Sequence, residues 1–572
     1  MVINGSTIQK NDYLRDEIMR GFFGLVFITP VFFSYAVFSA PLNPVDRNDI
    51  QQRQAEVIDQ SRQQRDSLLQ LNQPQATVNP GGVSDAGQCF SIKDIHYRNS
   101  SLLHENDKNK LNKNYINRCI NVSNINQLIH DISNWYIERG YITSRAFISE
   151  QDLSGEILQI DILEGRLESI KMNNQSTRAL KQVFPGLEGE ILNLRDIEQG
   201  MEQLNRMPTQ QVSIEIQPGN QPGYSIVNLT SKKQIPLTAN ISFDNSGQKS
   251  TGEQQLNGGL WADNVLGLAD QWFINSGHSS EFRDSRNAES LQTGVSLPYG
   301  YWTLSYDYSK SRYRNDFTNQ DFLWHSTGDS QTHRATLSHV VFRNGDMKTS
   351  LSAGMSHRIG QNYLNDVLLQ SSSRKLSSAI IGINHSQKLW GGLATLNPAY
   401  SRGTRWFGAE SDVGKSDHAP RAEFNKVTLA ASYYYPIAEN LHYLTNIYGQ
   451  YSPQRLYGSE QVTLGGETSV RGFKEQYLSG NRGGYWRNEV NWQVAQLPRL
   501  GSVTLTTALD GGHLFSQQAD RESAGTLWGA AVGAAIANQY LSQQITVGWP
   551  LAHPDWLKPD HAVAYYRVGL SF

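Results

Sequence analysis

The chain ends in AVAYYRVGLSF, residues 562–572, and this stretch predicts the fold of much of the chain. Side chains of a strand alternate between two faces. One face carries Tyr566, Val568, Leu570 and the terminal Phe572, and the other carries Tyr565, Arg567, Gly569 and Ser571. One apolar and one mixed face suit a strand between lipid and a watery lumen, and an aromatic terminal residue is common in bacterial outer-membrane barrels. Soluble strands alternate too, so these residues alone leave a soluble β-protein open.

The composition excludes a helical membrane protein. The chain has 572 residues with 38% hydrophobic content and a mean hydropathy of -0.49. Beyond the first forty residues no apolar run approaches the roughly 20 residues of a spanning helix. A polar chain rich in Gly and aromatic residues suits a barrel with a hydrophilic lumen. The formal net charge of -3 gives no reason to expect a nucleic-acid partner.

The amino terminus predicts export. Three basic residues precede an apolar stretch, namely Lys10, Arg15 and Arg20 before Gly21 to Phe38. We interpret residues 1–40 as a secretory signal peptide with a long basic region. Cleavage could follow Ala36 or Ala40, and Ser34-Tyr35-Ala36 fits the small-x-small rule better. An uncleaved membrane anchor is the alternative, which Pro30 disfavours because it interrupts the run.

The chain has two cysteines, Cys89 and Cys119. Both follow the signal and enter an oxidising compartment, so we predict one disulfide that closes a loop of about 30 residues. Two free, buried thiols are the alternative.

The segment after the signal predicts a polar helix. Residues 41–70 are dense in Gln, Arg and Asp with few apolar positions. Such a helix buries little apolar surface, so it bridges solvent, is disordered or occupies a polar cavity. Residues 71–88 have the Pro, Gly and Ser content of a flexible linker.

Two small α/β modules are predicted next, at residues 89–167 and 168–235. In the first, a helix over 125–139 precedes a strand pair at 145–149 and 156–163. The second repeats the plan, with a strand at 168–172, helices at 177–183 and 194–206, and strands at 211–217 and 224–231.

Residues 236–572 predict a transmembrane β-barrel. Segments such as 302–308, 335–342 and 443–451 are apolar or aromatic at every second position. We count about sixteen antiparallel strands of roughly 10 residues each. A soluble sandwich or propeller needs the same alternation, but the signal peptide and the terminal Phe572 favour the membrane form.

A long segment, residues 452–482, separates the eleventh and twelfth predicted strands. It contains Leu464-Gly465-Gly466-Glu467-Thr468-Ser469-Val470-Arg471-Gly472-Phe473. Its glycines allow a sharp reversal that could return it into the lumen.

This motif resembles the sixth-loop signature of two-partner secretion transporters, in the outer-membrane assembly-factor superfamily. The stretches 135–141 (WYIERGY) and 163–165 (LEG) are similar to marks of polypeptide-transport-associated (POTRA) modules. Residues 204–208 (LNRMP) and 218–225 resemble the second such module of this subfamily. The resemblance implies a plug helix, two POTRA modules and a sixteen-strand barrel, which agrees with the periodicity.

The resemblance also implies a set of site residues in the barrel lumen. The loop arginine of the family pairs with an aspartate in a Phe-x-Asp-x-Gly motif on the thirteenth strand, which assigns Arg471 and Asp510 to these roles. Val470, Gly472, Phe473 and Gly512 complete the two motifs, whereas Ala508 departs from the expected aromatic residue. On the twelfth strand, Arg487 and Glu489 share a face with Asn491, and we expect them to line the lumen wall.

No motif predicts an enzyme, a cofactor or a metal site. The stretch 408–416 looks like a phosphate-binding loop, but its spacing is one residue too long and no helix is predicted after it. The 14 histidines show no metal-ligand spacing, and no Gly-x-Ser-x-Gly elbow is present.

The expected function is a secretion pore of the outer membrane with its POTRA modules in the periplasm. The resemblance implies a partner exoprotein with its own amino-terminal secretion domain, namely an adhesin, a haemolysin or a contact-dependent inhibition toxin. Further partners are outer-membrane lipid and the barrel-assembly machinery that inserts this chain. The alternatives are an assembly factor for other outer-membrane proteins and a solute porin.

Overall fold

The computed structural model describes residues 42–70, 89–232, 234–516 and 524–572. The predicted signal peptide, residues 1–40, and the predicted linker, residues 71–88, lie outside the described residues. Among the described helices, none is both long and apolar enough to cross a membrane.

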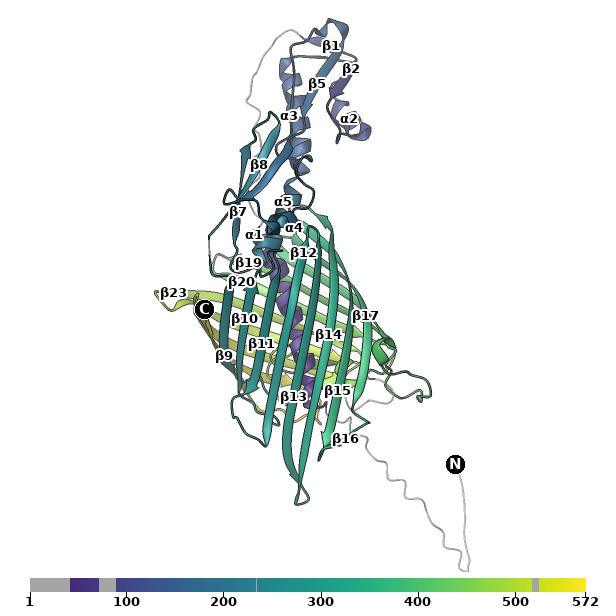
Figure 1. The fold of residues 1–572 in the computed structure, drawn as a ribbon, viewed down its shortest axis with the longest axis vertical. Coiled ribbons are helices and arrows are strands. Elements are labelled where there is room, and N and C mark those ends of the chain that lie inside the picture. The colour runs from purple at the N-terminus through teal and green to yellow at the C-terminus, as the bar shows by residue number, and fades with distance from the viewer. Residues whose placement is uncertain (1–41, 71–88, 233, 517–523) are drawn as a thin grey trace, which may run out of the picture. The chain divides into compact units, whose positions relative to one another are not determined.

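Sixteen strands hydrogen-bond into a closed antiparallel barrel, which confirms the predicted fold class (Figure 1). They are β9 (Leu237–Asp244), β10 (Gln255–Asp263), β11 (Gln271–Ser279), β12 (Arg286–Tyr299), β13 (Trp302–Asn319), β14 (Phe322–Arg343), β15 (Met347–Leu364), β17 (Arg374–Leu389), β18 (Gly392–Thr404), β19 (Asn425–Ala438), β20 (Leu441–Tyr451), β23 (Gly483–Leu497), β24 (Gly501–Leu514), β25 (Gly525–Ala537), β26 (Leu541–Ala552) and β27 (Val563–Ser571). A two-residue strand, β16 (Val367–Leu368), pairs with the end of β15. The last strand closes the ring by pairing with β9, so the barrel wall has no free edge.

Several strands are longer than predicted. The expected length was roughly 10 residues, but β13 has 18 residues and β14 has 22. These two strands stay paired from Trp302↔His339 to Asn319↔Phe322 and turn at Gln320 and Asp321, which both have positive φ. Side chains alternate between the two faces of a strand both inside and outside the membrane. The periodicity of the sequence therefore did not show where the lipid-facing part of β13 and β14 ends.

The wall alternates as the last strand predicts. Val568 and Leu570 are exposed on the outside, whereas Tyr565 is buried on the inside. The same pattern holds on β23, where Trp486 and Trp492 are exposed and Arg487 is buried. The outer surface is therefore apolar and aromatic, and polar side chains collect in the lumen.

The first α/β module has a helix on one face of a three-stranded sheet ordered β2-β5-β4. Its elements are β1 (Phe90–Ile92), β2 (Asp94–Arg98), α2 (Glu105–Asn112), β3 (Arg118–Ile120), α3 (Val122–Glu138), β4 (Arg145–Phe147), a short 3-10 turn (Leu153–Gly155) and β5 (Ile157–Leu163). Asn121 and Asn124 form a capping box that starts α3, and Gly140 ends it at a φ of +94°. The polar helix α2 was not predicted, because it has no apolar periodicity.

The second module follows the predicted plan closely. It comprises β6 (Arg166–Met172), α4 (Arg178–Val183), α5 (Leu194–Asn205), β7 (Val212–Pro218) and β8 (Tyr224–Ser231), with the sheet order β6-β8-β7. The side chain of Thr177 caps α4, and that of Asn193 caps α5. Position 200 of α5 is a glycine, and the ring of Phe184 packs so close to the helix there that a Cβ would lie 2.0 Å from it.

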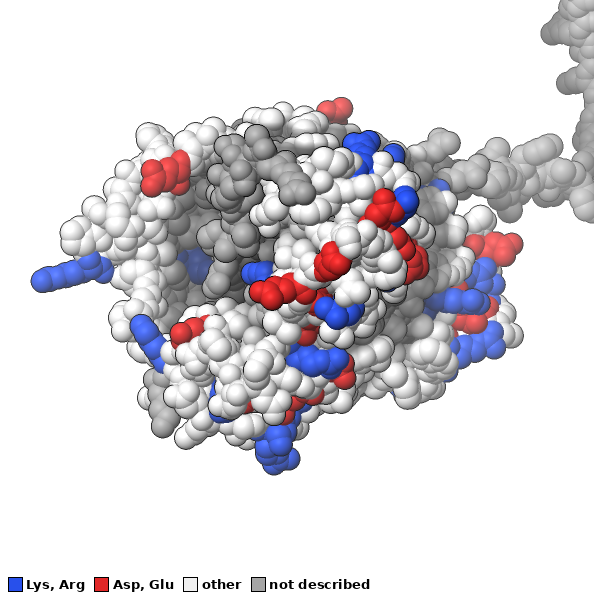
Figure 2. Space-filling view, turned by 90° about the horizontal axis from the view of Figure 1, so that it is seen from above, with Lys and Arg blue, Asp and Glu red and all other residues white. Residues whose placement is uncertain are grey.

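An ion cluster joins α5 to the barrel. Arg343, at the end of β14, donates to Glu202 at 2.6 Å and to Gln199 at 2.8 Å, and Lys348 of β15 pairs with Glu202. Nearby, Tyr301 donates to Asp196 at 2.5 Å. The side chain of Arg343 is only 2% exposed, whereas those of Glu202 and Lys348 are 20% and 19% exposed. Seen from above in Figure 2, basic and acidic side chains are intermixed rather than separated by sign.

The disulfide joins Cys89 and Cys119, as expected, at a Cα–Cα distance of 5.3 Å. It ties the strand pair β1–β3 across a sequence separation of 30 residues. We predict that a Cys89→Ala/Cys119→Ala variant loses about 2 to 4 kcal/mol of first-module stability. Hydrogen exchange of α3 in the full-length protein measures this loss, while heat-modifiable migration of the barrel should not change. Alkylation of native protein without reductant should add no mass, and two added groups would contradict the bridge.

The ion cluster predicts resistance to acid. Burial raises the pKa of Glu202, but its pairing with Lys348 and Arg343 outweighs this and lowers that pKa from 4.5 to about 2. The stabilisation is therefore complete above pH 4.5 and is lost only as the pH falls toward 2. Exchange protection of α5, corrected for intrinsic rates, should be equal at pH 7 and pH 5. Glu202→Gln should lower it at both values, and wild-type loss above pH 5 would contradict the assignment.

Candidate functional site in the barrel lumen

Helix α1 (Pro44–Gln70) lies inside the barrel. The side chain of Asn43 accepts a hydrogen bond from the amide of Asp46 at 2.8 Å and so starts the helix. One face is buried although it is largely polar, with Arg47, Ile50, Gln54, Ser61, Arg65 and Leu68 recurring along it. The predicted polar helix thus occupies a polar cavity, which was one of the alternatives left open by the sequence.

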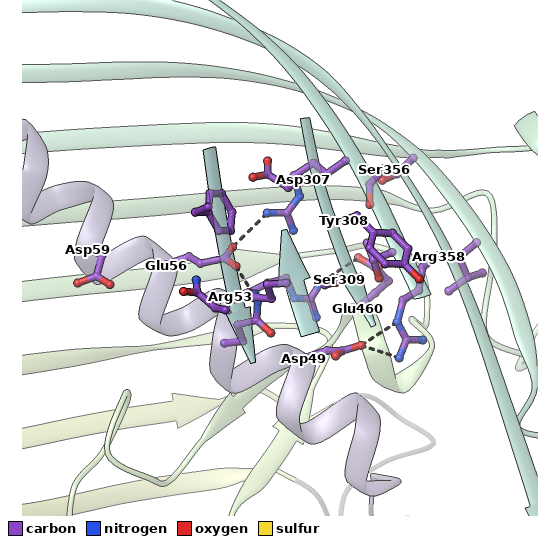
Figure 3. Close-up of a pocket in the computed structure, with 18 of the residues that line it drawn as sticks. Asp49, Arg53, Glu56, Asp59, Asp307, Tyr308, Ser309, Ser356, Arg358 and Glu460 are labelled. Atoms are coloured by element: carbon purple, nitrogen blue, oxygen red, sulfur yellow. Dashed lines mark hydrogen bonds and ion pairs between the residues drawn. The ribbon is translucent and has the colours of Figure 1, made fainter. Parts of the chain in front are cut away.

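Charged pairs hold the helix against the wall. Arg358 of β15 donates to Asp46 at 2.6 Å and to Asp49 at 2.9 Å. Further along, Arg334 of β14 donates to Glu56 at 3.1 Å, and Arg65 donates to Ser432 of β19 at 2.6 Å. Figure 3 shows Asp49 joined to Arg358 and Glu56 projecting from α1 into a cavity beside the helix. The cavity measures 460 Å³, so the helix does not fill the lumen.

The predicted long loop, residues 452–482, returns into the lumen. It contains a 3-10 turn (Gly458–Glu460) and a short hairpin, β21 (Val462–Leu464) and β22 (Leu478–Gly480), whose strands pair with each other. Gly465 and Gly466 have φ values of +113° and +119°, which other residues rarely adopt. These two glycines turn the chain from β21 toward the tip at residues 470–473.

Arg471 at the loop tip contacts two wall carboxylates. Its Nε donates to Asp510 Oδ2 at 2.6 Å, and its Nη2 donates to Asp510 Oδ1 at 2.7 Å. Its backbone amide also donates to Asp510 at 3.1 Å. The remaining Nη1 donates to Glu489 at 2.8 Å. This is the bidentate geometry in which a guanidinium matches a carboxylate best.

The pair is buried and balanced in charge. Asp510 is 0% exposed and Arg471 is 5% exposed. Arg487 donates to Glu489 at 3.0 Å, so two arginines face two carboxylates. An unpaired charge at this depth would be costly, because little water reaches it.

Apolar contacts surround the ion pairs. Val470 and Phe473 are both 0% exposed and join a cluster with Leu464, Leu478, Tyr485, Leu514, Leu527 and Leu557. Tyr565 of the last strand donates to the carbonyl of Phe473 at 2.9 Å. The tip is therefore held by β24 on one side and by β27 on the other.

Glycines permit the close approach of loop and wall. Gly472 has a φ of +100°, and a Cβ there would lie 2.5 Å from the backbone of Trp549. A Cβ on Gly529 would lie 1.7 Å from the carbonyl oxygen of Arg471. Gly512 faces Leu464 and Val470, each of which would be 3.1 Å from an added Cβ. Ala508, where an aromatic residue was expected, lies opposite Glu489 in the strand register.

Contacts between α1 and the loop were not predicted. Gln54 donates to the carbonyl of Thr463 at 2.9 Å and accepts from Thr468 at 2.9 Å. Arg47 pairs with Glu475 at 3.2 Å. Since such contacts join residues about 400 positions apart, no local pattern could have revealed them.

The phosphate-loop-like stretch carries a different interaction. Lys415 pairs with Asp412 at 3.0 Å and with Glu410 at 3.3 Å, so its ammonium group is engaged by the same loop. Within the ranges that the structure describes, no cluster of three or more His, Cys, Asp or Glu residues could hold a metal ion.

A sixteen-strand barrel whose lumen holds a helix and a long loop, with two α/β modules before the barrel, defines an outer-membrane transporter with POTRA modules. The chain belongs to the haemolysin secretion/activation protein family ShlB/FhaC/HecB, whose model matches residues 223–536. A ShlB-type POTRA domain matches residues 90–165, and a second POTRA domain matches 166–218. The barrel lies in the outer membrane and the POTRA modules lie in the periplasm.

The chain is similar to the outer membrane transporter CdiB of Dickeya dadantii strain 3937. The two are 63% identical, over 94% of this chain and 97% of the relative. The solved CdiB from Escherichia coli is 49% identical with a TM-score of 0.91, covering 94% of this chain and 100% of that one. CdiB from Acinetobacter baumannii is 26% identical with a TM-score of 0.77, covering 93% and 100% of the two chains.

We predict that Gly472→Ala displaces the loop tip, because the residue has positive φ and no room for a Cβ. Gly480→Ala is the matched control in the same loop, since its Cβ would meet only the flexible end of Leu514 at 3.4 Å. Limited proteolysis of the folded barrel should cut the loop in the first variant and spare it in the second. Equal protection of both variants would show that the tip tolerates a side chain.

Proposed function

We propose that this chain is the transporter of a two-partner secretion pair. Its POTRA modules take up an exported exoprotein in the periplasm, and its barrel conducts that protein to the cell surface. The observation that carries the proposal is a lumen occupied by two segments. Helix α1 is fastened mainly by polar contacts, and the long loop is fastened by a buried ion pair within an apolar cluster.

Helix α1 can be withdrawn at low cost. Among the buried residues of α1 only Val45, Ile50 and Leu68 are large and apolar. Removing the helix therefore exposes little apolar surface, and its charged groups regain water. A segment meant to stay in place would be expected to bury a wider apolar stripe.

The export path needs no catalytic chemistry. An extended client can add a strand to a POTRA sheet edge through backbone hydrogen bonds, which uses neither nucleotide nor cofactor. Both three-stranded sheets leave edges for this, at β2 and β4 in the first module and at β6 and β7 in the second. Folding of the client outside the cell then drives transport in one direction, and we assign the chain no enzymatic activity.

The cargo is a secreted exoprotein of the adhesin, haemolysin or contact-dependent inhibition class. Outer-membrane lipid surrounds the barrel, and the barrel-assembly machinery inserts it. An assembly factor for other barrels is the alternative, which two POTRA modules and a lumen helix disfavour. A solute porin has no use for periplasmic modules.

We assign the residues Val470, Arg471, Gly472, Phe473, Asp510 and Gly512 the role of a loop lock, with Arg487 and Glu489 supporting it from the wall. The lock holds the loop in the lumen, and the loop in turn contacts α1 through Glu475 and Thr468. Lock and helix are thereby mechanically connected.

The lock predicts a non-additive pair of defects in secretion. Arg471→Ala leaves Asp510 buried without its partner, at a cost of about 1 to 3 kcal/mol in loop docking. Asp510→Ala should give a similar loss of exported exoprotein, and the double variant should be no worse, because one interaction is lost once. The measurement is exoprotein in the medium, normalised to folded barrel. The control is Arg482→Ala in the same loop, because Arg482 donates to two backbone carbonyls and lies over the ring of Tyr451 but contacts no carboxylate. Additive defects would contradict the lock.

Deletion of residues 41–70 should raise single-channel conductance in planar bilayers, because α1 lies in the lumen and contacts β13, β14, β17, β18 and β19. The barrel should stay folded, as judged by heat-modifiable migration, since the wall strands pair without the helix. Unchanged conductance would show that other segments close the pore.

A further inference from the structure

An apolar groove crosses the outside of the barrel over β13 to β19. It encloses 780 Å³ and is lined by outward-facing residues of the wall. Ala353, a small outward-facing residue, lies in its middle, whereas the larger side chains of Leu351, Ile381 and Tyr400 stand around it. At the periplasmic end, Trp302 stacks on His339 with their ring centroids 4.1 Å apart. The groove is a dent in a surface that otherwise meets lipid, and its shape suits acyl chains.

Two cations lie on the same face of the same strands, nearer the extracellular end. Arg402 is two residues beyond Tyr400 on β18, which places it about 7 Å further along that strand. On β17, which runs antiparallel to β18, Lys375 lies six residues before Ile381. This places it about 20 Å nearer the extracellular end than Ile381. Both side chains are exposed. The register sets Arg402 opposite Ala379 and Lys375 opposite Ile359, so neither faces a carboxylate across the ladder.

Neighbouring acidic groups are already paired. Glu423 accepts from Arg405 at 2.7 Å, and Glu410 pairs with Arg374 and Lys415. In the part of the chain that the structure describes, neither Lys375 nor Arg402 forms an ion pair. Two cations on a lipid-facing wall, close to the headgroup level, are thus left to bind an anion.

Aromatic residues mark the level of the headgroups. Trp406 and Phe407 follow β18 directly and are 49% and 65% exposed. Phe407 has a φ of 58° and its ring lies 5.5 Å from that of His357, an outward-facing residue of β15. Exposed aromatic rings gather where the membrane meets water.

We propose that this face of the barrel is a binding site for a phosphorylated, acylated glycolipid of the outer leaflet, with acyl chains in the groove and phosphates on Arg402 and Lys375. The Cα atoms of the two cations are separated by about 14 Å in ideal strand geometry, which suits two phosphates on one sugar headgroup. The occupant is lipid A or its lipopolysaccharide, because its phosphates complement the two cations and its acyl chains suit the apolar groove below them.

Native mass spectrometry of the full-length protein in detergent tests the site. The probes are diphosphorylated lipid A, lipid A with both phosphates removed, and inorganic phosphate. Wild type should retain one diphosphorylated lipid in preference to the dephosphorylated one. Lys375→Gln/Arg402→Gln should bind the diphosphorylated lipid about 25-fold more weakly, at about fivefold for each cation, and should leave binding of the dephosphorylated lipid unchanged.

Two further variants separate groove from charge. Ala353→Phe fills the groove and should weaken both lipids, whereas Arg314→Gln should change neither, because Arg314 faces outward on β13 but already pairs with Asp316 at 3.1 Å. Heat-modifiable migration confirms that each barrel is folded. Equal binding by wild type and the double variant would overturn the proposal. Full competition by inorganic phosphate would also overturn the proposal, since the groove would then contribute nothing to lipid binding.

Discussion

In a lipid environment every backbone amide and carbonyl must find a partner within the protein, and the rest of this structure depends on that constraint. The closed ring from β9 to β27 satisfies it along the wall, with register shifts at a few positions. The backbone groups of the wall are paired with one another. A segment in the lumen can therefore bind the wall only through side-chain contacts, and its own backbone is paired within its helix or hairpin. Helix α1 and the β21–β22 hairpin each pair backbone groups within themselves, so neither takes part in the hydrogen-bond ladder of the wall.

The loop tip shows how a charged contact becomes specific in such a lumen. A lone guanidinium in a buried site would be unfavourable, but Arg471 satisfies four of its donors on Asp510 and Glu489. The approach that makes this possible depends on missing side chains at Gly472, Gly529 and Gly512. The apolar cluster around Val470 and Phe473 then excludes water from the pair. The ion pair thus determines where the loop tip binds, while the glycines allow the close approach and the apolar residues exclude water.

Much of the architecture could be predicted because it rests on local periodicity. Period-two alternation predicted the barrel strands, and the helical stretches at 125–139 and 194–206 predicted α3 and α5. Arg471 and Asp510 were found through sequence motifs, not through physics, since nothing local says that a loop residue meets a strand 39 positions away. The contacts of Gln54 with the loop, the long β13–β14 hairpin and the polar helix α2 escaped prediction. Each depends on tertiary neighbours or has no apolar signal of its own.

The direction of α1 has a topological consequence. Its first turn contacts the long loop, where the amide of Leu42 donates to Tyr477, while its last turns reach Ser432 on β19. The helix therefore runs toward the end of the barrel where α5 is attached, with its beginning at the opposite mouth. If it leaves toward the periplasm, everything joined ahead of Leu42 must be threaded through the pore behind it. Since cleavage after Ala36 or Ala40 would leave only a few residues ahead of Leu42, this exit would require little more room than the helix itself.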